Sequence, residues 1–444
     1  MAASDKRSSA TLDKITALCK RRGFVYQSAD IYGGLNGVYD FGPLGTLLKQ
    51  NIKQAWTASL FKISDAIVLL DGAILAPHAV WEASGHTESF HDPMVDCLNC
   101  KKRFRADDID LDKACPSCGI KKWTDIRQFH MMFKTNLGAL ADQASVAYLR
   151  PETAQAIFIN FKNVLSTSRV KVPFGIAQIG KAFRNEITPK QFLFRMREFE
   201  QMELEWFCKP SDAQKFFDFW ISAREAFYQT IGIKKQNLRV RSHEKEELSH
   251  YSTNTSDIEY HFPFGWKELE GIAYRGNYDL SQHMKHSGKD LSIYDDATKE
   301  SYVPHVVECS VGVDRLFLTA LFDAYNEETI DGEQRIVLRL HPSLAPYKAA
   351  FFPLTKKQSE PMYTLYKNIK DAEIPVQFDD SGSIGKRYRR QDEIGTPVCF
   401  TYDFDSEIDQ SVTVRHRDSM KQERIPLDKV LEYMKNLENI FTQQ

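Results

Sequence analysis

Residues 177–207, AQIGKAFRNEITPKQFLFRMREFEQMELEWF, contain two stretches in which polar and apolar side chains alternate. Alternation with a period of two is typical of a strand that buries one face. The polar faces carry Gln178, Arg184 and Glu186 in the first stretch, and Arg197, Phe199, Gln201 and Glu203 in the second. The apolar faces carry Ile179 and Phe183, then Met202, Leu204 and Trp206. The pattern predicts an antiparallel hairpin that packs its apolar side on a core and turns its charged side toward a cleft.

Two arginines on the polar face suggest that this cleft binds a polyanion. The loop at 187–194 contains Pro189 and Lys190 and could reach toward such a ligand. The simpler alternative is a half-exposed hairpin with ordinary surface ion pairs, which contribute little to stability. The hairpin alone leaves both interpretations open.

The whole chain has the composition of a soluble globular protein. Its 444 residues suffice for two or three domains, and 42% of them are hydrophobic and 27% charged. No run of about 18 apolar residues occurs, and the N-terminal MAASDKRSSA lacks the apolar segment of a signal peptide. We therefore expect a cytoplasmic protein that does not enter a membrane. The net charge of −2 neither indicates nor excludes RNA, because a large enzyme can be basic only where RNA docks.

Four of the eight cysteines have the spacing of a metal site. Cys97-x2-Cys100 and Cys115-x2-Cys118 stand fourteen residues apart, so each turn can direct two thiolates at one ion. Two such turns close a tetrahedron without an open position, which predicts structural zinc rather than catalytic metal. Four buried free cysteines are the alternative. The remaining cysteines are scattered, which fits a reducing compartment.

The N-terminal segment predicts two helices around a glycine-rich loop. Residues 11–22 have helical spacing and a basic last turn, and Gly23 ends the helix. The loop IYGGLNGVYDFGPLG (31–45) follows, and its proline starts a second helix over residues 44–61. On its own, this is a loop that enters a core helix.

Three segments around the hairpin have simple structural interpretations. In YLRPETAQAIFINF (148–161), Pro151 and Glu152 make a favourable helix start, because a carboxylate is stabilised near the N-terminal end of the dipole. A helix over 211–231 is rich in aromatic residues of the kind found in cores. No chemistry is assigned to the polar stretch 234–256.

Two later segments place charged residues next to glycines. WKELEG (266–271) predicts a strand that carries Glu268, and Arg275 follows four residues after its glycine. VVECSVGVDR (306–315) predicts a buried strand, a turn at Gly312 and a helix that starts at Arg315. Such a turn into a helix N-terminus accepts anions, although many proteins contain one for packing alone.

The C-terminal part alternates strands with helices, which indicates a parallel or mixed sheet. Strands are expected at 335–340, 345–354 and 375–378, with helices at 358–371 and 427–441. Between them, GSIGKRYRRQDEIGTP holds a basic run that on charge alone is a solvated helix face: Lys386, Arg387, Arg389 and Arg390.

These strings together resemble the glycyl-tRNA synthetases, a family of class II aminoacyl-tRNA synthetases. FRNE (183–186) with REFE (197–200) resembles the second signature motif, IYGGLNGVYDFGPLG the first, and VVECSVGVDR the third, while RPETAQ (150–155) is similar to a further family segment. The resemblance covers residues 14–440, and the motifs occur in the expected order. Cys309 stands where the family usually has proline, and Asp314 where it often has glycine.

The resemblance implies an α+β fold. A catalytic domain over residues 1–333 would contain the antiparallel six-stranded sheet of class II synthetases with flanking helices, and a zinc-ribbon insertion at 95–122 would interrupt it. An α/β anticodon-binding domain would follow over 334–444. The first motif would form the interface of a homodimer.

The implied reaction is that of a glycine–tRNA ligase. Glycine reacts with ATP to give glycyl-adenylate and pyrophosphate, and the terminal adenosine of tRNA(Gly) then accepts the glycyl group. The attacking carboxylate is already an anion and needs no general base. Positioning and charge neutralisation must therefore supply most of the catalysis.

The resemblance also implies site residues. The catalytic residues would be Arg184 on the α-phosphate and the glycine carboxylate, Arg275 near the α-phosphate, and Arg315 on the γ-phosphate. ATP would also contact Asn185, Glu186, Phe194, Arg195, Arg197, Glu198, Phe199, Glu268, Leu269 and Gly312. Glycine would contact Arg105, Glu152, Phe199, Gln201, Glu203, Glu308 and Ser310. Glu268 and Glu308 would hold Mg²⁺ with ATP, and tRNA would lie along Lys386, Arg387, Arg389 and Arg390.

Glycine has no side chain to bind, so its recognition must use the ammonium group. In this interpretation Glu152 and Glu203 bind the ammonium, and Ser310 supplies a further oxygen. Filled space near Cα would exclude even a methyl group, and a purely hydrophobic pocket would reject alanine less well.

Two alternatives remain. A non-catalytic tRNA-binding paralogue of the same fold should have lost Arg184, Glu186 or Arg315, and this chain keeps all three. Another class IIa synthetase, for serine, threonine, proline or histidine, is the second. A threonine enzyme would hold zinc in its active site through mixed Cys and His ligands, which the four-cysteine pattern does not match.

Overall fold

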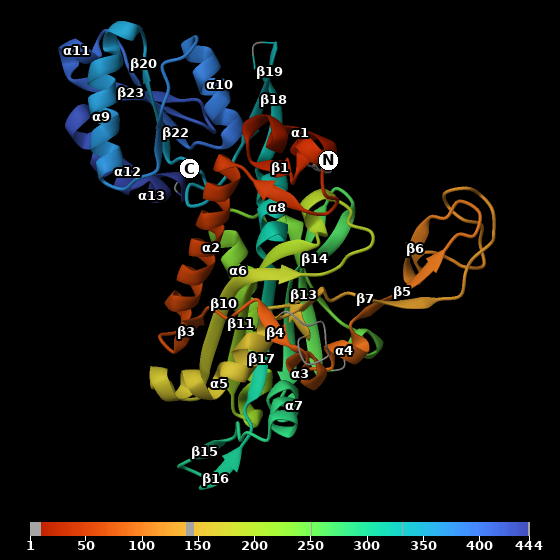
Figure 1. Cartoon of the computed structure of the whole chain (residues 1–444). Coiled ribbons are helices and arrows are strands. Elements are labelled where there is room, and N and C mark those ends of the chain that lie inside the picture. The colour runs from red at the N-terminus through yellow and green to blue at the C-terminus, as the bar shows by residue number, and fades with distance from the viewer. Residues whose placement is uncertain (1–9, 139–145, 250, 331, 443–444) are drawn as a thin grey trace, which may run out of the picture.

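A seven-stranded sheet forms the centre of the molecule (Figure 1). The computed structural model describes residues 10–138, 146–249, 251–330 and 332–442. Six strands run antiparallel to their neighbours, as predicted, and β3 adds a parallel seventh strand at the edge beside β10. The strand order is β12 (Leu238–Ser242), β13 (Asn254–Phe262), β14 (Gly265–Gly276), β17 (His305–Gly312), β11 (Glu198–Cys208), β10 (Phe174–Phe183) and β3 (Ile67–Leu70).

The predicted hairpin is the antiparallel pair of β10 and β11. Gln178 lies opposite Glu203, and Ala182 lies opposite Phe199. Strand β10 ends at Phe183, so Arg184 and Glu186 lie just beyond it. Met202, Leu204 and Trp206 on the other face belong to the main core, which confirms the predicted division of the hairpin into two faces.

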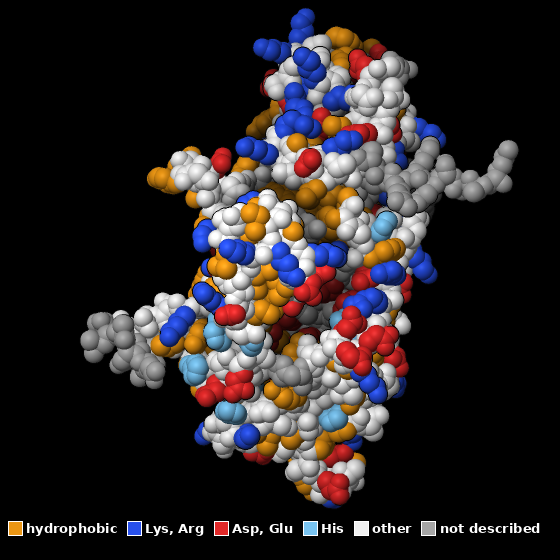
Figure 2. All heavy atoms as spheres, turned by 90° about the vertical axis from the view of Figure 1, so that its right-hand side faces the viewer, with side chains coloured by type: hydrophobic (Ala, Val, Ile, Leu, Met, Phe, Trp, Pro, Cys, Tyr) orange, Lys and Arg blue, Asp and Glu red, His pale blue; other side chains and the backbone are white. Residues whose placement is uncertain are grey.

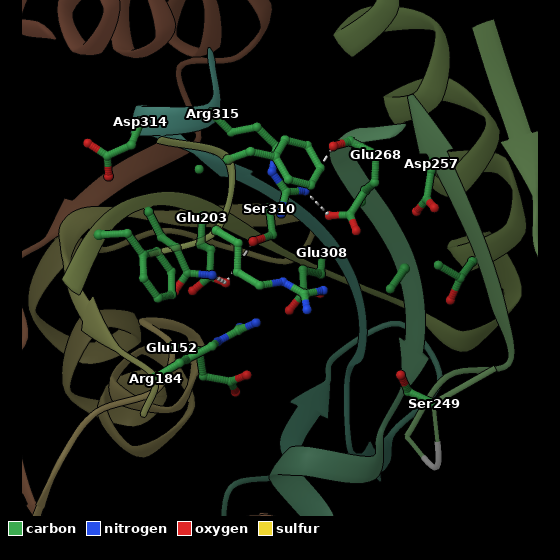
Figure 3. Close-up of a pocket in the computed structure, with 18 of the residues that line it drawn as sticks. Glu152, Arg184, Glu203, Ser249, Asp257, Glu268, Glu308, Ser310, Asp314 and Arg315 are labelled. Carbon is green, nitrogen blue, oxygen red and sulfur yellow. Dashed lines mark hydrogen bonds and ion pairs between the residues drawn. The ribbon is translucent and has the colours of Figure 1, made fainter. Parts of the chain in front are cut away.

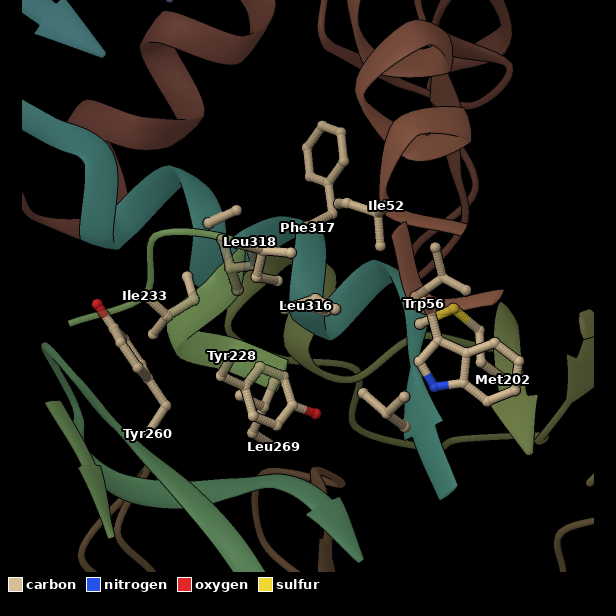
Figure 4. Close-up of a cluster of buried hydrophobic side chains, with 14 of the residues drawn as sticks. Ile52, Trp56, Met202, Tyr228, Ile233, Tyr260, Leu269, Leu316, Phe317 and Leu318 are labelled. Carbon is tan, nitrogen blue, oxygen red and sulfur yellow. The ribbon is translucent and has the colours of Figure 1, made fainter. Parts of the chain in front are cut away.

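Helices pack against one face of the sheet. Three of them pack there: α2 (Pro43–Ile63), α6 (Ala213–Thr230) and α8 (Val313–Ala324). Figure 4 shows Leu316, Phe317 and Leu318 of α8 between Ile52 and Trp56 of α2 on one side and Tyr228 of α6 on the other. These side chains are all buried, so α8 is fixed tightly against the sheet at the point where Arg315 begins it.

The opposite face of the sheet is only partly covered. Helices α5 (Ala154–Ser168) and α7 (Tyr278–Ser287) pack on one half through a separate aromatic cluster that includes Phe158, Phe161 and Phe174. The other half carries Gln201, Glu203 and Ser310, whose side chains line a cavity. The sheet therefore has one face packed against α2, α6 and α8 and one face that is partly open.

Small elements surround this core. Helix α1 (Leu12–Arg22) begins at Thr11, whose hydroxyl accepts from the Lys14 amide, and ends at Gly23 with φ +74°, as predicted. The insertion with the four cysteines projects to the right in Figure 1. The other elements are β1 (Val25–Gln27), β2 (Tyr39–Phe41), β4 (Leu75–Pro77), α3 (His78–Ala83), α4 (His86–Ser89), β5 (His91–Asp96), β6 (Arg103–Arg105), β7 (Arg127–His130), β8 (Lys134–Asn136), β9 (Val146–Leu149), β15 (Ile293–Asp295), β16 (Glu300–Tyr302), β18 (Tyr325–Ile330) and β19 (Glu333–Leu338).

The C-terminal module is a mixed five-stranded sheet with its own core. Strand β20 is parallel to both of its neighbours and the other pairs are antiparallel, which agrees with the predicted α/β pattern. The predicted last helix is two short helices separated at Asn436. The elements are β21 (Val376–Phe378), β20 (Ala349–Pro353), β22 (Val398–Tyr402), β23 (Ser411–His416) and β24 (Gln422–Pro426), with α9 (Ser359–Asp371), α10 (Ile384–Ile394), α11 (Ser406–Asp409), α12 (Val430–Lys435) and α13 (Leu437–Thr442).

Two ion pairs, one partly buried and one fully buried, join this module to the rest of the chain. Arg22 of α1 pairs with Glu393 of α10 at 2.6 Å, and Arg335 of β19 pairs with Asp392 at 2.8 Å. The predicted domain boundary between residues 333 and 334 falls at the start of β19, which pairs with β18. Within the described residues, no helix is both long and apolar enough to cross a membrane.

Candidate functional site

A cavity of about 370 Å³ opens on the uncovered half of the sheet face. Figure 2 shows the hollow from outside, with acidic side chains gathered inside it. In Figure 3 the labelled side chains converge on this cavity from several strands and from the start of α8. Thirteen residues predicted to bind ATP or glycine line it: Glu152, Arg184, Glu186, Phe194, Arg195, Phe199, Gln201, Glu203, Glu268, Glu308, Ser310, Gly312 and Arg315.

Glu203 lies at the centre of the acidic end and accepts hydrogen bonds from three sides. The Thr153 amide donates at 2.9 Å, the Ser310 hydroxyl at 2.8 Å and the Gln201 amide at 3.2 Å, and the Thr153 hydroxyl also donates. Burial raises the pKa of Glu203 to about 7, and the nearby Glu308 and Glu152 carboxyls add to this shift. These donors fix the carboxylate in one orientation, in which it can accept hydrogen bonds from a cationic group.

Glu152 lies beside it and is oriented by a second set of contacts. His86 Nε2 lies 3.3 Å from one carboxylate oxygen, and the Gln155 amide donates to the other at 3.1 Å. Burial raises the pKa of this carboxyl, but His86 and Arg275 together hold it well below its usual range. Glu152 is therefore an ionised, buried acceptor next to Glu203.

Arg150 anchors the turn that carries Glu152. Its guanidinium crosses Gly180 of β10 and donates to the carbonyl oxygens of Gly72 and Lys181, both at 2.7 Å. A side chain on Gly180 would collide with this guanidinium, so the close approach requires glycine. The turn before α5 is thus tied to the hairpin that carries Glu203.

The other end of the cavity is lined by arginines and aromatic rings. The Arg184 guanidinium lies 5.3 Å from the centre of the Phe199 ring, and its Nε donates to the Pro151 carbonyl at 3.1 Å. Glu186 lies near Arg195, with 4.0 Å between Oε2 and Nε. Burial raises the pKa of Glu186, and the two arginines oppose that shift. A planar, cationic and apolar lining of this kind suits a nucleotide, because a guanidinium fork matches phosphate and a ring can stack on a base.

Arg315 closes this end from the start of α8. Its guanidinium packs 4.4 Å from the centre of the Phe194 ring and lies 3.1 Å from a Glu268 carboxylate oxygen. Strand β17 ends at Gly312 and leads directly into α8, so the helix N-terminus and Arg315 reach the cavity together. Both features favour an anion at this position.

Comparison with known proteins agrees with this geometry. Residues 133–325 match the family model described as the tRNA synthetase class II core domain (G, H, P, S and T), and residues 348–437 match the anticodon binding domain. A glycine–tRNA ligase of Caldanaerobacter subterraneus subsp. tengcongensis is 54% identical, and the alignment covers 96% of this chain and 98% of that protein. The chain belongs to the glycine–tRNA ligase family. A relative of the same name from Geobacillus thermodenitrificans is 51% identical, over 97% of this chain and 98% of its own.

The fold is shared more widely than the family. The crystal structure of prolyl-tRNA synthetase from Cryptosporidium parvum, complexed with halofuginone and AMPPNP, matches with a TM-score of 0.69 at 15% identity. The match covers 99% of this chain and 78% of the other. Similarity at this level concerns the architecture alone.

Arg275 does not line the cavity, contrary to its predicted direct catalytic role. Its Nε and Nη2 donate to both oxygens of Asp279 at 2.8 Å, and Nη1 donates to Glu308 at 2.7 Å. The side chain is buried against the Tyr251 ring. The guanidinium is thus committed to two carboxylates, of which Glu308 lines the cavity.

Five other predicted contacts also lie outside the lining of the cavity. Arg197 donates to the carbonyls of Glu186 at 2.8 Å and Asn36 at 2.7 Å, so it holds the loop together. Glu198 points to the opposite side of β11 and pairs with Lys181 at 2.8 Å, and Leu269 is buried in the main core. The remaining two are Asn185, whose backbone N–H donates to the Met131 carbonyl, and Arg105, which pairs with Asp92 at 3.1 Å.

The polar stretch 234–256 contributes to the cavity although no chemistry is assigned to it from sequence. His243, Ser249, Ser252 and Thr255 line its outer end together with Asp257 of β13. His243 Nε2 lies 2.7 Å from an Asp257 oxygen, and burial and the nearby Glu268 raise the pKa of Asp257. Most of these residues lie in a connection between strands whose sequence has neither strand nor helix periodicity. Only the spacing of Thr255 and Asp257, two residues apart on β13, could have indicated that they share a face.

Asp314 is a further lining residue that the sequence interpretation treats only as a departure from the family pattern. It forms an ion pair with the Lys49 ammonium at 2.6 Å and accepts a hydrogen bond from the Glu200 backbone N–H at 2.7 Å. Lys49 also pairs with Glu200 at 3.1 Å. A charged chain thus links α2 to the residue before Arg315, and glycine at this position would remove it.

The four predicted zinc ligands come together in the insertion. Their sulfur atoms all lie within 4.8 Å of one another, with 3.6 Å between Cys97 and Cys118 and 3.8 Å between Cys100 and Cys115. Two sulfurs on one tetrahedral zinc, each at about 2.3 Å, lie roughly 3.8 Å apart. The cluster has the size and the soft donors of a closed metal site.

The basic run of α10 is divided between the surface and the interior. Lys386 is exposed, whereas Arg387 is 5% exposed and donates to the carbonyls of Pro353, Asp380 and Gly382. Arg389 and Arg390 are half-buried and pair with Glu333 and Asp379. The prediction that Arg387 contacts RNA is wrong, because its guanidinium satisfies backbone oxygens inside the module.

Proposed function

We propose that this cavity activates glycine with ATP and passes the glycyl group to the terminal adenosine of tRNA(Gly). One observation carries the proposal: an acidic end built from Glu152, Glu203 and Glu308 adjoins an end lined by Arg184, Phe199 and Arg315 in a single cavity. An ammonium group fits the first end, and a nucleotide triphosphate fits the second. Family membership supports the same reaction.

The first step joins a glycine carboxylate oxygen to the α-phosphorus of ATP and breaks the bond to pyrophosphate. Arg184 lines the nucleotide end and donates to the carbonyl of Pro151, the neighbour of Glu152, so its fork can bind the glycine carboxylate and the α-phosphate. Arg315 neutralises charge toward the γ-phosphate, where the helix N-terminus adds to its effect. Phe199 stacks on the adenine, and Glu186 accepts from the adenine amino group.

Magnesium enters with ATP in this proposal. Glu268 and Glu308 both line the cavity and offer carboxylate oxygens, the ligands that Mg²⁺ prefers. The ion supplies charge neutralisation on the phosphates. Arg315 beside Glu268 and Arg275 beside Glu308 keep these two carboxylates in place before the nucleotide binds.

Glycine is selected by its ammonium group. Glu152 and Glu203 accept from it, Ser310 offers a hydroxyl oxygen, and Gln201 keeps Glu203 oriented. Because Glu203 and Glu152 are fixed by neighbours on separate elements, they cannot move apart easily to admit a larger substrate. Alanine is thus rejected by sterics together with ammonium geometry.

The second step requires tRNA to reach two parts of the molecule. Residues 1–333 hold the catalytic site, and residues 334–444 bind the anticodon arm, with Lys386 and Arg389 facing RNA phosphates. We also infer a homodimer that acts in the cytoplasm. Support for the dimer comes from the loop before α2, where three apolar side chains are strongly exposed: Ile31, Tyr32 and Leu35. Sedimentation analysis that finds only monomers at micromolar concentration would contradict it.

Zinc holds the insertion together in this proposal. The four cysteines close the site without an open position, so the ion is structural. Atomic absorption should give one zinc per chain, and Cys115→Ser should lower that value and leave glycine activation largely intact. Zinc-free protein with an unchanged proteolysis pattern in the insertion would exclude the structural role.

Glycine-dependent ATP–pyrophosphate exchange tests the central claim. Glu203→Ala should abolish exchange and keep the fold, because the ammonium loses its main acceptor while the sheet is unchanged. Glu198→Ala is the matched control, since it lies on the same strand but faces away from the cavity. Wild-type exchange in Glu203→Ala contradicts the assignment, and a panel of amino acids distinguishes glycine from the serine, threonine, proline and histidine substrates of related synthetases.

A further inference from the structure

Gln178 is a buried residue of β10 that no step of the proposed reaction uses. It lies between β3 and β11, beside Leu70 in the parallel ladder and opposite Glu203 in the antiparallel one. Its side chain is fully buried and does not line the cavity. A buried amide needs partners for its carbonyl oxygen and its N–H groups, so these partners show which segments it joins.

The amide of Gln178 joins two segments that are far apart in the chain. The backbone N–H of Gly72, just after β3, donates to its Oε1 at 2.5 Å. Its Nε2 donates to the backbone carbonyl of Thr153, just before α5, at 2.6 Å. One partner can only donate and the other can only accept, so the orientation of the amide is determined. Gln178 therefore holds the turn before α5 against the end of β3.

Thr153 is also the residue that fixes Glu203. Its backbone N–H donates to Glu203 Oε2 at 2.9 Å, and its hydroxyl donates to the same oxygen. The carbonyl that Gln178 binds belongs to the same residue as these two donors, so a rotation of the turn would displace all three groups. The position of the Glu203 carboxylate thus depends on the hydrogen bond that Gln178 gives to Thr153.

The same network requires glycine at position 72. A Cβ atom there would lie 2.7 Å from Gln178 Oε1 and 2.5 Å from Ala156 Cβ, closer than side chains approach one another. The Gly72 carbonyl accepts from Arg150 at 2.7 Å, while its N–H binds Gln178. Both ends of the turn at 150–153 are therefore connected to one glycine, directly through Arg150 and indirectly through Gln178.

We propose that Gln178 is a positioning residue that determines the specificity for glycine. It acts through Thr153, whose turn carries Glu152 and whose donors fix Glu203. The two carboxylates are thereby held at the separation that suits the ammonium group of glycine, and a looser turn would admit a methyl group on Cα. This role rests on the proposed function of Glu152 and Glu203 in glycine binding.

The nucleotide end of the cavity depends less on this turn. It meets the turn where Arg184 donates to the Pro151 carbonyl at 3.1 Å, whereas Phe199 and Arg315 are carried by β11 and the start of α8. Loss of the Gln178 hydrogen bonds should therefore affect glycine more than ATP. This difference separates a specific role of Gln178 from a general loss of packing.

Gln178→Met removes both hydrogen bonds and keeps a side chain of similar length. Exchange assays give KM for glycine, KM for ATP and kcat/KM for glycine and for alanine. KM for glycine should rise about tenfold and KM for ATP less than about threefold, because Thr153 loses the bond that holds its carbonyl. The preference for glycine over alanine in kcat/KM should fall about tenfold, because the looser pocket admits a methyl group.

Gln358→Met is the matched control. Gln358 is also buried, and its Oε1 accepts from the Thr355 backbone N–H at 3.0 Å in the C-terminal module. Both variants should melt at lower temperature than wild type, but Gln358→Met should keep the wild-type KM for glycine and the wild-type preference over alanine. A wild-type KM for glycine in Gln178→Met, or an equal rise in KM for glycine and for ATP, would overturn the proposal.

Two further measurements decide the matter if Gln178→Met does not fold. Gly72→Ala must displace Gln178 Oε1 or Ala156, so KM for glycine should again rise more than KM for ATP, and a wild-type KM would contradict the proposal. Hydrogen exchange on the wild-type protein needs no variant: the Gly72 amide should be protected by Gln178 although it lies outside any strand, and rapid exchange would also overturn the proposal. Absence of glycine-dependent exchange of pyrophosphate in wild type would instead refute the proposed function.

Discussion

Two arginine-rich segments of this chain, residues 184–197 and 386–390, lie in opposite environments. In the first, Arg184 and Arg195 point into a cavity at the end of two strands. In the second, Arg387 turns into the interior of the C-terminal module, and only part of the charge remains outside. A strand pair divides its side chains between two faces, whereas four basic residues among five on a helix must point in several directions.

Each segment also contains an arginine that serves the backbone. Arg197 donates to the carbonyls of Glu186 and Asn36, and Arg387 donates to those of three residues around α10. A guanidinium that satisfies buried carbonyls cannot also pair with phosphate unless those bonds break. The role of an arginine in these segments therefore depends on the backbone groups around it and not on charge density alone.

Among substitutions in the two arginine segments, Arg184→Lys should have the largest effect. Lysine keeps the charge but lacks the fork that can bind carboxylate and phosphate together, so exchange should fall about 10²–10³-fold. Arg197→Lys is the matched control from the same segment, and it should cost more stability than activity. Exchange rates and thermal melting of both variants give the comparison. Arg184→Lys activity within about tenfold of wild type would contradict the assigned role.

Arg387→Met should lower stability rather than catalysis. It leaves buried carbonyl oxygens without donors, which should cost about 2 kcal/mol, or roughly 10 °C in the melting temperature of a module of this size. Arg389→Met is the control, because that side chain is more exposed and its one ion pair among the described residues is with Glu333 at 3.3 Å. If both variants melt alike, the two arginines have equivalent environments and the comparison fails.

The period of two predicted correctly that Phe199 and Glu203 point into the cavity. The same period places Glu198 on the opposite face, so its predicted contact with ATP, which came from the resemblance, conflicts with the alternation. The edge strand β3 was missed, since a run of four apolar residues fits many structures. A β-bulge between Ile258 and Glu259 interrupts the alternation of β13, so pattern alone could not show which of its acids line the cavity.

Other parts of the site could not be predicted because they depend on long-range contacts. The role of Arg275 is decided by Asp279 and Glu308, and Glu308 lies 33 residues away in the chain. The position of Arg387 depends on carbonyls that only the folded module brings together. The resemblance supplied residue types at the right positions, but the hydrogen bonds that assign Arg275 and Arg197 to supporting roles had to come from the structure.

The pH dependence of glycine binding should show whether the hairpin face works through Glu203. Its pKa is raised to about 7 by burial and the neighbouring Glu308 and Glu152 carboxyls. Below this pH the group takes up a proton and the ammonium loses an acceptor, so KM for glycine should rise, by up to about tenfold per pH unit. KM for ATP should change less. Glu203→Gln should have a high and nearly flat KM for glycine, and a flat wild-type profile down to about pH 5.5 would contradict the role of Glu203.

Glu203 should contribute more to the folding stability of the ligand-free protein as the pH falls, although glycine binding becomes weaker. The folded state binds the Glu203 proton more tightly than the unfolded chain, in which the pKa has its ordinary value of 4.5. The Glu203 contribution to stability therefore increases as the pH falls from about 7 to 4.5 and is lost as the pH rises again through the folded pKa. The difference in melting temperature between wild type and Glu203→Gln, measured without glycine across this range, isolates that contribution.

The smallest effect is expected on α10, from the double substitution of Lys386 and Arg389 by alanine. These side chains are the ones on the basic run that do not depend on buried carbonyls, so they remain available for RNA phosphates. Losing two phosphate contacts should raise KM for tRNA only a few-fold and reduce the salt dependence of log KM by about one to two units of slope. Lys429→Ala removes an exposed charge from the turn that precedes α12 and serves as the control. Aminoacylation measured at several salt concentrations shows whether these side chains contact RNA phosphates or are only solvated charge. If the double variant keeps the wild-type salt slope, the basic face of α10 is solvated charge. Residues 184–197 would then bind a ligand, whereas residues 386–390 would only stabilise the C-terminal module.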